Sequence, residues 1–290
     1  MQDISKYIHY FSSIYRKNCS HWDKSEKACT NKGGCICAKF GEVQGHIRSL
    51  IQPNYRNATI YDYTGTLEKP DGEVVRVVSV EDVEHIQDQM WKFLYGDAPF
   101  QEDLTRPELN ALSVLDDRFK RGECLVIHGD ARRQSKYEKM HMQERMPTGK
   151  SFLASIATID AIWRRCFITN TAITYDWASF LKMRILLKTR YIEEHQEVEE
   201  AKESDFLVID DINTISGEFG DKAANWTREK LDNFLMYRMD HHKPTILVCN
   251  FDVEKVDLPG HMGDAFDKLV YSSGTTRIRV EPASQSLRGS

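Results

Sequence analysis

The stretch Pro147-Thr148-Gly149-Lys150-Ser151 is followed directly by an apolar helical pattern that begins at Phe152. This order of residues is typical of the second half of a phosphate-binding loop. In such a loop, backbone N–H groups at the start of a helix face an anion, the Lys reaches the β- and γ-phosphates, and the Ser hydroxyl ligates Mg²⁺. The complete pattern has a Gly five residues before Gly149, where this chain has Glu144. Because so short a match also arises by chance, its assignment as a phosphate-binding loop depends on other motifs in the chain.

A glycine suited to the start of such a loop lies further upstream. Residues 124–129 read as a short buried strand that ends in Gly129, as expected before a phosphate loop. The polar residues 130–146 that follow contain five basic side chains: Arg132, Arg133, Lys136, Lys139 and Arg145. We interpret them as an insertion that splits the loop and leaves strand and helix in their usual places. The insertion either extends a DNA-binding surface or is a solvated loop.

A second group of polar residues follows another buried strand. Residues 205–211 read Asp-Phe-Leu-Val-Ile-Asp-Asp, and the four consecutive apolar residues predict a strand buried on both faces. Ligands of open α/β sheets bind at the carboxyl ends of such strands, where Asp210 and Asp211 stand. Asp210 can hold Mg²⁺, and Asp211 can orient the water that attacks a γ-phosphate. Because this strand and its two acids follow Lys150 and Ser151 in the sequence, the two motifs together indicate a nucleoside triphosphatase.

The remaining patterns predict further elements. Residues 243–250 predict a buried strand ending at Asn250, which either contacts the γ-phosphate or the attacking water, or simply caps the turn. Ser79 is a suitable N-cap for a helix, and Asp176 or Ser179 is suited to cap another that carries Phe180 and Leu181. The other predicted strands cover 57–63, 74–80 and 166–169, with a loop over 64–72, and the predicted helices cover 80–95, 106–120, 152–165, 193–203 (solvated) and 222–241.

The first 50 residues differ in character from the rest. Four of the seven cysteines fall within nineteen positions: Cys19, Cys29, Cys35 and Cys37. Four thiolates can close a tetrahedral zinc site, which would let so small a segment fold. His21 can replace Cys19, an iron–sulfur cluster would use the same thiolates, and unliganded thiols are a further alternative. We predict a cysteine-rich, zinc-binding N-terminal domain over residues 1–50.

Composition sets wider bounds. Of 290 residues, 41% are hydrophobic and 29% charged, as in an ordinary soluble globular protein. The formal net charge is −5, so contacts with DNA must come from local patches. No apolar run approaches the roughly 20 residues of a membrane span, and the polar N-terminus lacks the apolar core of a signal peptide. These features predict a cytoplasmic protein whose cysteines are thiols or metal ligands.

In order and spacing, the motifs resemble the AAA+ class, specifically the bacterial helicase loaders of the DnaC and DnaI types and their transposition relative IstB. The matching segments are 52–63, 124–129, 147–151, 167–169, 205–212, 225–229 and 243–250. The resemblance implies an α/β AAA+ P-loop fold, a three-layer sandwich with a central parallel sheet, over residues 51–290. Lead-in elements would occupy 51–122 and the nucleotide-binding core 123–290. The cysteine-rich segment is similar in placement to the zinc-bearing, helicase-binding domain of DnaI-type loaders.

The resemblance also implies a function. The chain would be an ATPase, weak alone and stimulated by DNA or a partner, that loads a hexameric replicative helicase onto single-stranded DNA during replication initiation and self-associates through its AAA+ faces. An IstB-like transposition helper and a non-hydrolysing adaptor with a degenerate loop are the alternatives. Lys150, Asp210, Asp211 and Asn250 would be catalytic, with Mg²⁺ on Ser151 and Asp210. ATP would be bound by Gly129, Pro147, Thr148, Gly149, Lys150, Ser151, Phe152 and Arg288.

Besides the split phosphate loop, two further positions depart from the family pattern. Where the family has an Arg that reaches a neighbour's ATP, Phe266-Asp267-Lys268-Leu269 offers Lys268, a point charge without the planar fork of Arg. Arg238, Arg277 or another Arg would then act in trans, or trans-activation would be weak. The Ser-x-Arg at the end of the family's chain is matched loosely by Ser286-Leu287-Arg288, which makes Arg288 a candidate contact of the γ-phosphate.

Overall fold

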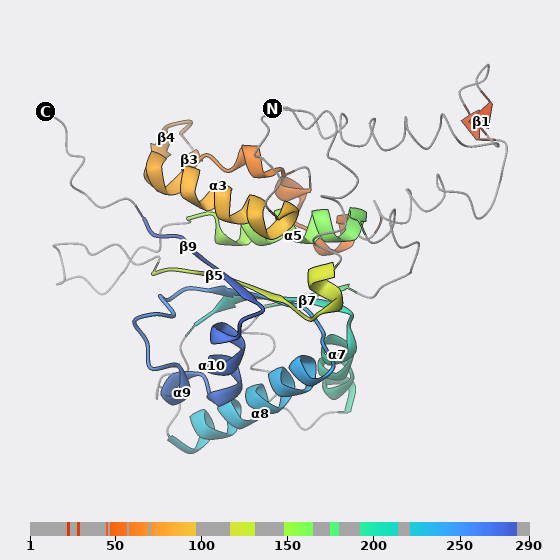
Figure 1. The fold of residues 1–290 in the computed structure, drawn as a ribbon, viewed down its shortest axis with the longest axis vertical. Coiled ribbons are helices and arrows are strands. Elements are labelled where there is room, and N and C mark those ends of the chain that lie inside the picture. Colours follow the sequence, from red (N-terminus) through yellow and green to blue (C-terminus); the bar gives the residue numbers. More distant parts are fainter. Residues whose placement is uncertain are drawn as a thin grey trace, which may run out of the picture.

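The fold is built on a five-stranded parallel sheet (Figure 1). The computed structural model describes residues 22–23, 28–29, 45, 47–56, 58–68, 71–96, 117–130, 148–164, 175–179, 192–213 and 221–282. The strand order is β6-β7-β8-β5-β9. The strands are β5 (Cys124–His128), β6 (Tyr175–Ser179), β7 (Phe206–Ile212), β8 (Thr245–Cys249) and β9 (Thr275–Arg279). This arrangement confirms the predicted α/β architecture with a central parallel sheet.

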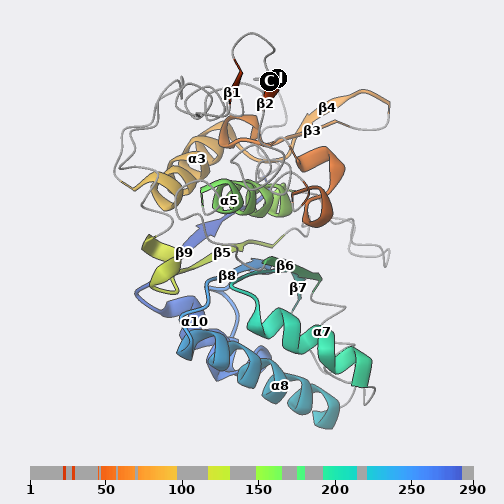
Figure 2. The same ribbon diagram turned by 90° about the vertical axis from the view of Figure 1, so that its right-hand side faces the viewer.

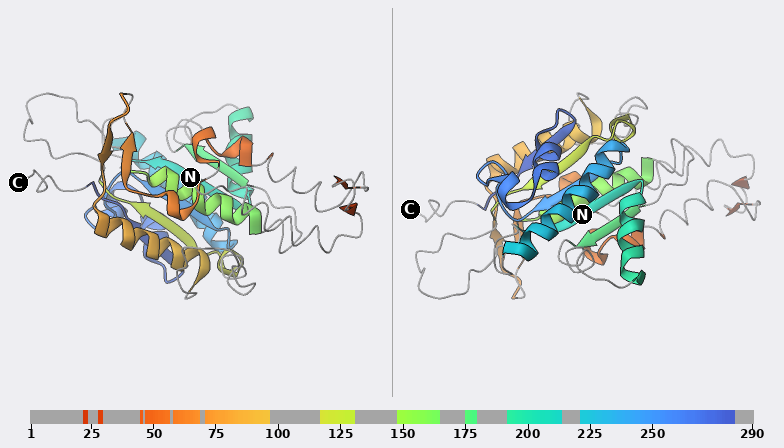
Figure 3. Two further views of the ribbon diagram at one scale, coloured as in Figure 1. Left: turned by 90° about the horizontal axis from the view of Figure 1, so that it is seen from above. Right: turned by 90° about the horizontal axis from the view of Figure 1, so that it is seen from below.

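Helices cover both faces of the sheet, which gives three layers (Figures 1 and 2). One face carries α3 (Val80–Tyr95) and α5 (Lys150–Arg164). The other carries α7 (Ile192–Glu203), α8 (Asp221–Asp240), α9 (Leu258–His261) and α10 (Asp264–Tyr271). Figure 3 shows α3 and α5 over the sheet from above, and α7 and α8 beneath it from below. Within the described residues, no helix is both long and apolar enough to cross a membrane.

The three central strands are buried along their apolar runs. Every residue of β5 and β8 is buried, as are the first four residues of β7. Because helices cover both faces, these strands have no alternation of apolar and polar residues. Side chains on one face enter a core with α3 and α5, and those on the other enter a core with α8 and α10. The strands predicted over 124–129, 205–211 and 243–250 are therefore confirmed.

Helix α3 begins and ends where its sequence predicts. The Ser79 hydroxyl oxygen accepts a hydrogen bond from the backbone N–H of Asp82 at 3.1 Å, which satisfies one of the helix's first donors. Gly96 follows the last turn with φ +68°, a conformation that glycine adopts at little cost. The helix packs Val83, Ile86 and Met90 into the first core.

The segment before α3 differs from its prediction. Of the strand predicted over 57–63, the described residues 58–63 do not form a strand: they contain the 3-10 turn η2 (Ile60–Asp62), preceded by η1 (Pro53–Tyr55). The Asp62 carboxylate accepts both the backbone N–H and the hydroxyl of Thr59, at 2.9 and 2.8 Å, which closes a turn. Pairing begins later, between β3 (Thr66–Glu68), predicted as a loop, and β4 (Val74–Arg76).

The prediction that Asp176 caps a helix is wrong. Asp176 lies inside β6, which pairs in parallel with β7 so that Asp176 stands opposite Leu207 and Ser179 opposite Asp210. Pairing with a buried neighbour strand outweighs a local capping preference, since strand propensity depends on context. The strand predicted over 166–169 and the helix predicted after Ser179 lie outside the described residues.

At the N-terminus the structure describes little of the cysteine-rich segment. Cys29 ends β2 (Ala28–Cys29), which pairs antiparallel with β1 (Trp22–Asp23). Cys19, His21, Cys35 and Cys37 lie outside the described residues. The predicted zinc site and the boundary at residue 50 therefore remain predictions.

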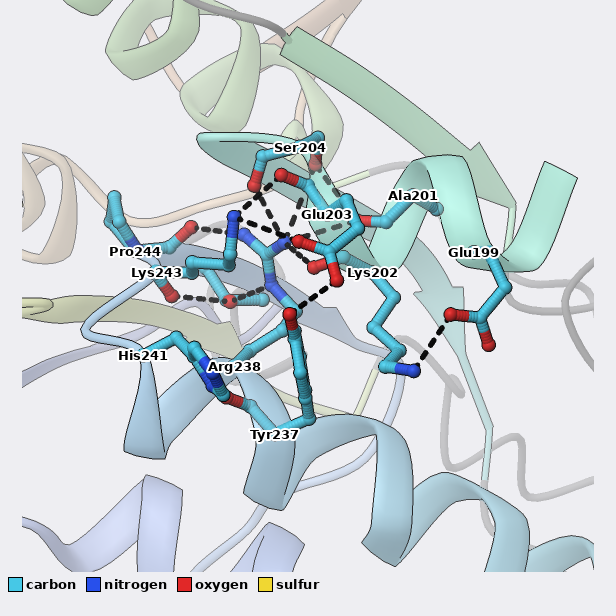
Figure 4. A network of polar contacts seen from close by, with 11 residues as sticks. Glu199, Ala201, Lys202, Glu203, Ser204, Tyr237, Arg238, His241, Lys243 and Pro244 are labelled. Carbon is cyan, nitrogen blue, oxygen red and sulfur yellow. Dashed lines mark hydrogen bonds and ion pairs between the residues drawn. The ribbon is translucent and has the colours of Figure 1, made fainter. Parts of the chain in front are cut away.

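Arg238 of α8 is fully buried where α7 ends and β8 begins (Figure 4). Its guanidinium donates to four backbone carbonyls at 2.8 to 3.0 Å, those of Ala201, Lys202, Ser204 and Pro244, and to the hydroxyls of Thr245 at 2.9 Å and Ser204 at 3.3 Å. The last carbonyls of a helix have no intrahelical partner, and a cation suits that end of the dipole. Arg238 therefore caps α7, and its burial excludes it as an arginine that reaches a neighbouring subunit.

Candidate nucleotide-binding site

The topology brings three strand ends to one edge of the sheet. Because β5, β7 and β8 are parallel neighbours, the residues after each strand lie at the same edge. After β5 the chain continues through α5 on one face, whereas after β8 it continues through α9 and α10 on the other (Figure 1). Open α/β sheets bind ligands where connections leave neighbouring strands on opposite faces. Here that point lies between β5 and β8.

Two glycines shape the loop at this edge. Gly129, directly after β5, has φ +146°, and a Cβ there would lie 2.0 Å from the carbonyl oxygen of Val280. Gly149, directly before α5, has φ +82°, and a Cβ there would lie 2.8 Å from Cε2 of Tyr63. Both positions therefore combine a left-handed backbone with a contact too close for a side chain.

Lys150 joins the two halves of the split loop. It is the first residue of α5 and is buried. Its Nζ donates to the carbonyl oxygen of Gly129 and to Oγ1 of Thr148, each at 3.2 Å. The first N–H groups of a helix have no intrahelical acceptor, so the start of α5 is suited to bind an anion beside this ammonium group. Pro147 and the basic insertion lie outside the described residues.

A hydrogen bond joins Ser151, in the first turn of α5, to Asp210, near the end of β7. The Ser151 hydroxyl donates to Oδ1 of Asp210 at 3.0 Å, and the same oxygen accepts the backbone N–H of Asp211 at 2.8 Å. Burial raises the pKa of Asp210, and the two hydrogen bonds and the charge of Lys150 oppose that rise. A hydroxyl and a carboxylate oxygen are hard ligands of the kind that Mg²⁺ takes. The pair therefore fits a magnesium ion.

An irregularity in β7 presents both aspartates to the site edge. The register with β8 shifts between Ile209, opposite Leu247, and Ile212, opposite Cys249. Two residues of β7 therefore stand against one of β8. In a regular strand, neighbouring side chains point to opposite faces, whereas a bulge redirects one of them.

Asp211 has the unusual backbone conformation at this bulge in β7. Its φ is +60°, one of two positive values among the described non-glycine residues, and such backbone outliers cluster at functional sites. Its carboxylate accepts a hydrogen bond from the side-chain amide of Asn250. The backbone N–H of Asn250 in turn donates to the carbonyl of Ile212 at 2.8 Å. The ends of β7 and β8 are thus locked together at the two predicted catalytic side chains.

A buried ionic cluster lies beside the loop. His128, the last residue of β5, has Nδ1 3.4 Å from Oδ1 of Asp252, and both are buried. Burial lowers the pKa of His128, so its imidazole is neutral at pH 7. Burial acts to raise the pKa of Asp252, but hydrogen bonds from Glu254 and Lys255 and the charge of Arg279 lower it overall. The cluster links His128, directly before Gly129, to Asp252 after β8, which also pairs with Arg279 at the end of β9.

The structure thus brings together most of the predicted residues, namely Gly129, Thr148, Gly149, Lys150, Ser151, Asp210, Asp211 and Asn250. Phe152 lies one turn into α5, where its ring packs against Tyr55 and Tyr63 at centroid distances of 5.4 and 6.4 Å. Arg288 lies outside the described residues. The sequence did not indicate Tyr63, His128 or Asp252, because their contacts span long separations and match no local motif.

The parallel sheet, with a helix that starts directly after a glycine loop, fits the α/β P-loop class. No family model matches the chain, and no curated protein matches it.

Several solved structures of replication proteins are similar. A protein assigned as a primosome component of Streptococcus pyogenes serotype M3 is 16% identical over 81% of this chain and 93% of its own, with a TM-score of 0.44. DnaI is 15% identical over 66% of this chain and 89% of its own, with a TM-score of 0.38. The initiator DnaA, bound to AMPPCP and single-stranded DNA, is 13% identical over 80% of this chain and 51% of its own, with a TM-score of 0.41.

Proposed function

We propose that this protein is an AAA+ ATPase that loads a hexameric replicative helicase onto single-stranded DNA during replication initiation. The ATPase part is supported by one observation: Lys150, Ser151, Asp210, Asp211 and Asn250 converge at the carboxyl edge of a parallel sheet. The helicase part is supported by the order and spacing of the sequence motifs.

In the proposed site, the start of α5 and Lys150 bind the phosphates of ATP. The ammonium group of Lys150 would exchange its hydrogen bonds to Gly129 and Thr148 for bonds to phosphate oxygens, which are stronger because both partners are charged. Ser151 and Asp210 would hold Mg²⁺, which neutralises negative charge on the phosphates when bound.

Asp211 is proposed to orient the water that attacks the γ-phosphate, and Asn250 to hold that carboxylate in place. The Asn250 amide donates to Asp211 while its backbone is fixed to Ile212. A γ-phosphate within reach of Asn250 would compete for the same amide donor. Release of Asp211 would then depend on the presence of that phosphate.

The Asp211→Asn variant is expected to turn over ATP about 100-fold more slowly or worse, the usual scale for loss of a general base. The ATP affinity should change by less than about threefold, since the phosphates are bound by other groups. Steady-state phosphate release and calorimetric binding measure the two quantities. Asp205→Asn, at the exposed opposite end of β7, is the matched control. Unchanged turnover in the Asp211 variant would remove that residue from the mechanism.

The interaction partners are proposed from the sequence alone. Residues 1–50 would bind zinc and grip the helicase, the basic insertion would extend a surface for single-stranded DNA, and neighbouring subunits would associate through their AAA+ faces. Lys268 and Arg277 are both exposed and remain candidates for the basic residue that acts on a neighbour's ATP.

Native mass spectrometry of the full chain with the helicase of its host, with and without ATP, tests the loader. We expect a discrete complex and a mass that includes zinc, and we expect both to be lost in a Cys35→Ser, Cys37→Ser variant. A complex without any ATP turnover would favour the non-hydrolysing adaptor. No complex under any nucleotide condition would favour the transposition helper, and a transposase would be the next partner to test.

A further inference from the structure

Tyr63 connects the lead-in segment to the phosphate loop. Its hydroxyl donates to the backbone carbonyl of Thr148 at 3.0 Å, in a buried contact between residues 85 positions apart. Its ring edge occupies the space that a side chain on Gly149 would need. The same ring stacks on Phe152 of α5, with centroids 6.4 Å apart and planes inclined by 29°. Tyr63 therefore contacts three of the five residues from 148 to 152.

Tyr63 is itself held from the other side. The side-chain amide of Gln87 in α3 donates to the carbonyl oxygen of Tyr63 at 2.9 Å and to that of Ile60 at 3.3 Å. The turn before Tyr63 is closed by Thr59 and Asp62. Burial raises the pKa of Tyr63 above its ordinary value, with a smaller contribution from Asp82. The hydroxyl therefore keeps its proton and stays a donor at neutral pH.

The bond to Thr148 sets the direction of a neighbouring N–H group. The peptide between Thr148 and Gly149 is trans, so its carbonyl and its N–H point in opposite directions. Glycine tolerates both orientations of such a peptide, because it adopts positive and negative φ with similar ease. A flipped peptide would present a carbonyl oxygen to an anion in place of an N–H donor.

We propose that Tyr63 is a positioning residue of the nucleotide site, whose hydroxyl holds the Thr148–Gly149 peptide in the orientation that binds the β-phosphate. The proposal rests on the proposed function, since it concerns the same phosphate loop. It makes the lead-in segment part of the nucleotide site. The loop's shape then depends on α3, through Gln87 and Tyr63.

The Tyr63→Phe variant tests the proposal, because it keeps the ring and removes only the donor. We expect calorimetric affinities for ADP and for a non-hydrolysable ATP analogue to fall together by about 5- to 30-fold. The affinity for AMP, which has no β-phosphate, should stay within about twofold, a selectivity that a general loss of stability would not produce. Tyr55→Phe removes a hydroxyl from the neighbouring ring on Phe152 and should leave all three affinities unchanged.

The outcomes separate this proposal from the proposed function. If the wild-type protein binds ADP, Lys150→Ala does not, and Tyr63→Phe binds as the wild type does, Tyr63 has no positioning role. If the wild type binds no nucleotide, the proposed function fails and this proposal fails with it. Should Tyr63→Phe not fold, Gln87→Leu frees the carbonyl of Tyr63 while retaining its hydroxyl. Weaker ADP binding by that variant would support the proposal, and unchanged binding would overturn it.

Discussion

The Lys150→Ala variant is expected to lose measurable ATP binding, with an affinity at least about 100-fold weaker than that of the wild type. Lys150 is buried at the start of α5 and already donates to oxygen atoms on both halves of the split loop. Two charge-assisted hydrogen bonds to phosphate, at roughly 1.5–3 kcal/mol each, account for a loss of this size. The measurement is calorimetric titration with a non-hydrolysable ATP analogue.

The control for this variant removes a lysine that lies far from the loop. Lys120 is exposed and forms a long ion pair with Asp117 at 3.8 Å, a contact that contributes little to stability. Lys120→Ala should bind the ATP analogue as the wild type does. Because Lys150 also holds the loop together, thermal unfolding should accompany the titration. Unchanged affinity in a folded Lys150→Ala protein would contradict the nucleotide assignment and favour the adaptor.

The central strands and the residues at their ends could be predicted because each strand is an unbroken apolar run. In β5, β7 and β8, burial on both faces removes the need for alternation. Parallel pairing then brings the polar residues after each run to one edge. That step needs no contact information, and for this reason Lys150, Asp210 and Asn250 could be placed near each other from the sequence.

The features that could not be predicted depend on partners far along the chain. Residues 175–179 form β6 only because β7 lies beside them, whereas their local sequence favours a helix start. Tyr63 meets Thr148 across 85 positions. The turn at residues 60–62 is different: Thr59 and Asp62 form a local capping pair, but the apolar alternation around them also indicated a strand.

The bulge at Asp211 could be predicted from the sequence only in part. Two adjacent acids after an apolar run could be recognised, but a regular strand would direct them to opposite faces. The positive φ of Asp211 and the register shift against β8 allow both carboxylates to reach the same edge of the sheet. A bulge of this kind depends on pairing with the neighbouring strand, so the sequence could identify both carboxylates and could not show how both reach the same edge.

The Arg238→Met variant is expected to lose about 3–5 kcal/mol of unfolding free energy, because each buried acceptor left without a donor costs about 1–3 kcal/mol. Met has a similar length but no donor, so the carbonyls of Ala201, Ser204 and Pro244 would lose their charged partner. Those carbonyls are enclosed where α7, β8 and α8 meet, and water cannot readily replace the guanidinium. Arg238→Lys should be intermediate, since an ammonium group has no planar fork. Urea unfolding measures both variants.

The same variant tests whether Arg238 acts only as a buried cap, and not as the arginine that the sequence offered as a contact of a neighbour's ATP. An arginine that reached a neighbour's ATP would be replaceable without loss of stability, and its removal would reduce turnover in the assembled protein. A buried cap behaves in the opposite way: stability falls, and the folded protein keeps its turnover. Arg277→Met, at an exposed position on β9 where the guanidinium lies 4.9 Å from the centre of the Tyr271 ring, should change the unfolding free energy by less than about 1 kcal/mol. Normal stability with lost turnover in Arg238→Met would require that the wild-type guanidinium leaves these buried acceptors, which would contradict its role as the cap of α7.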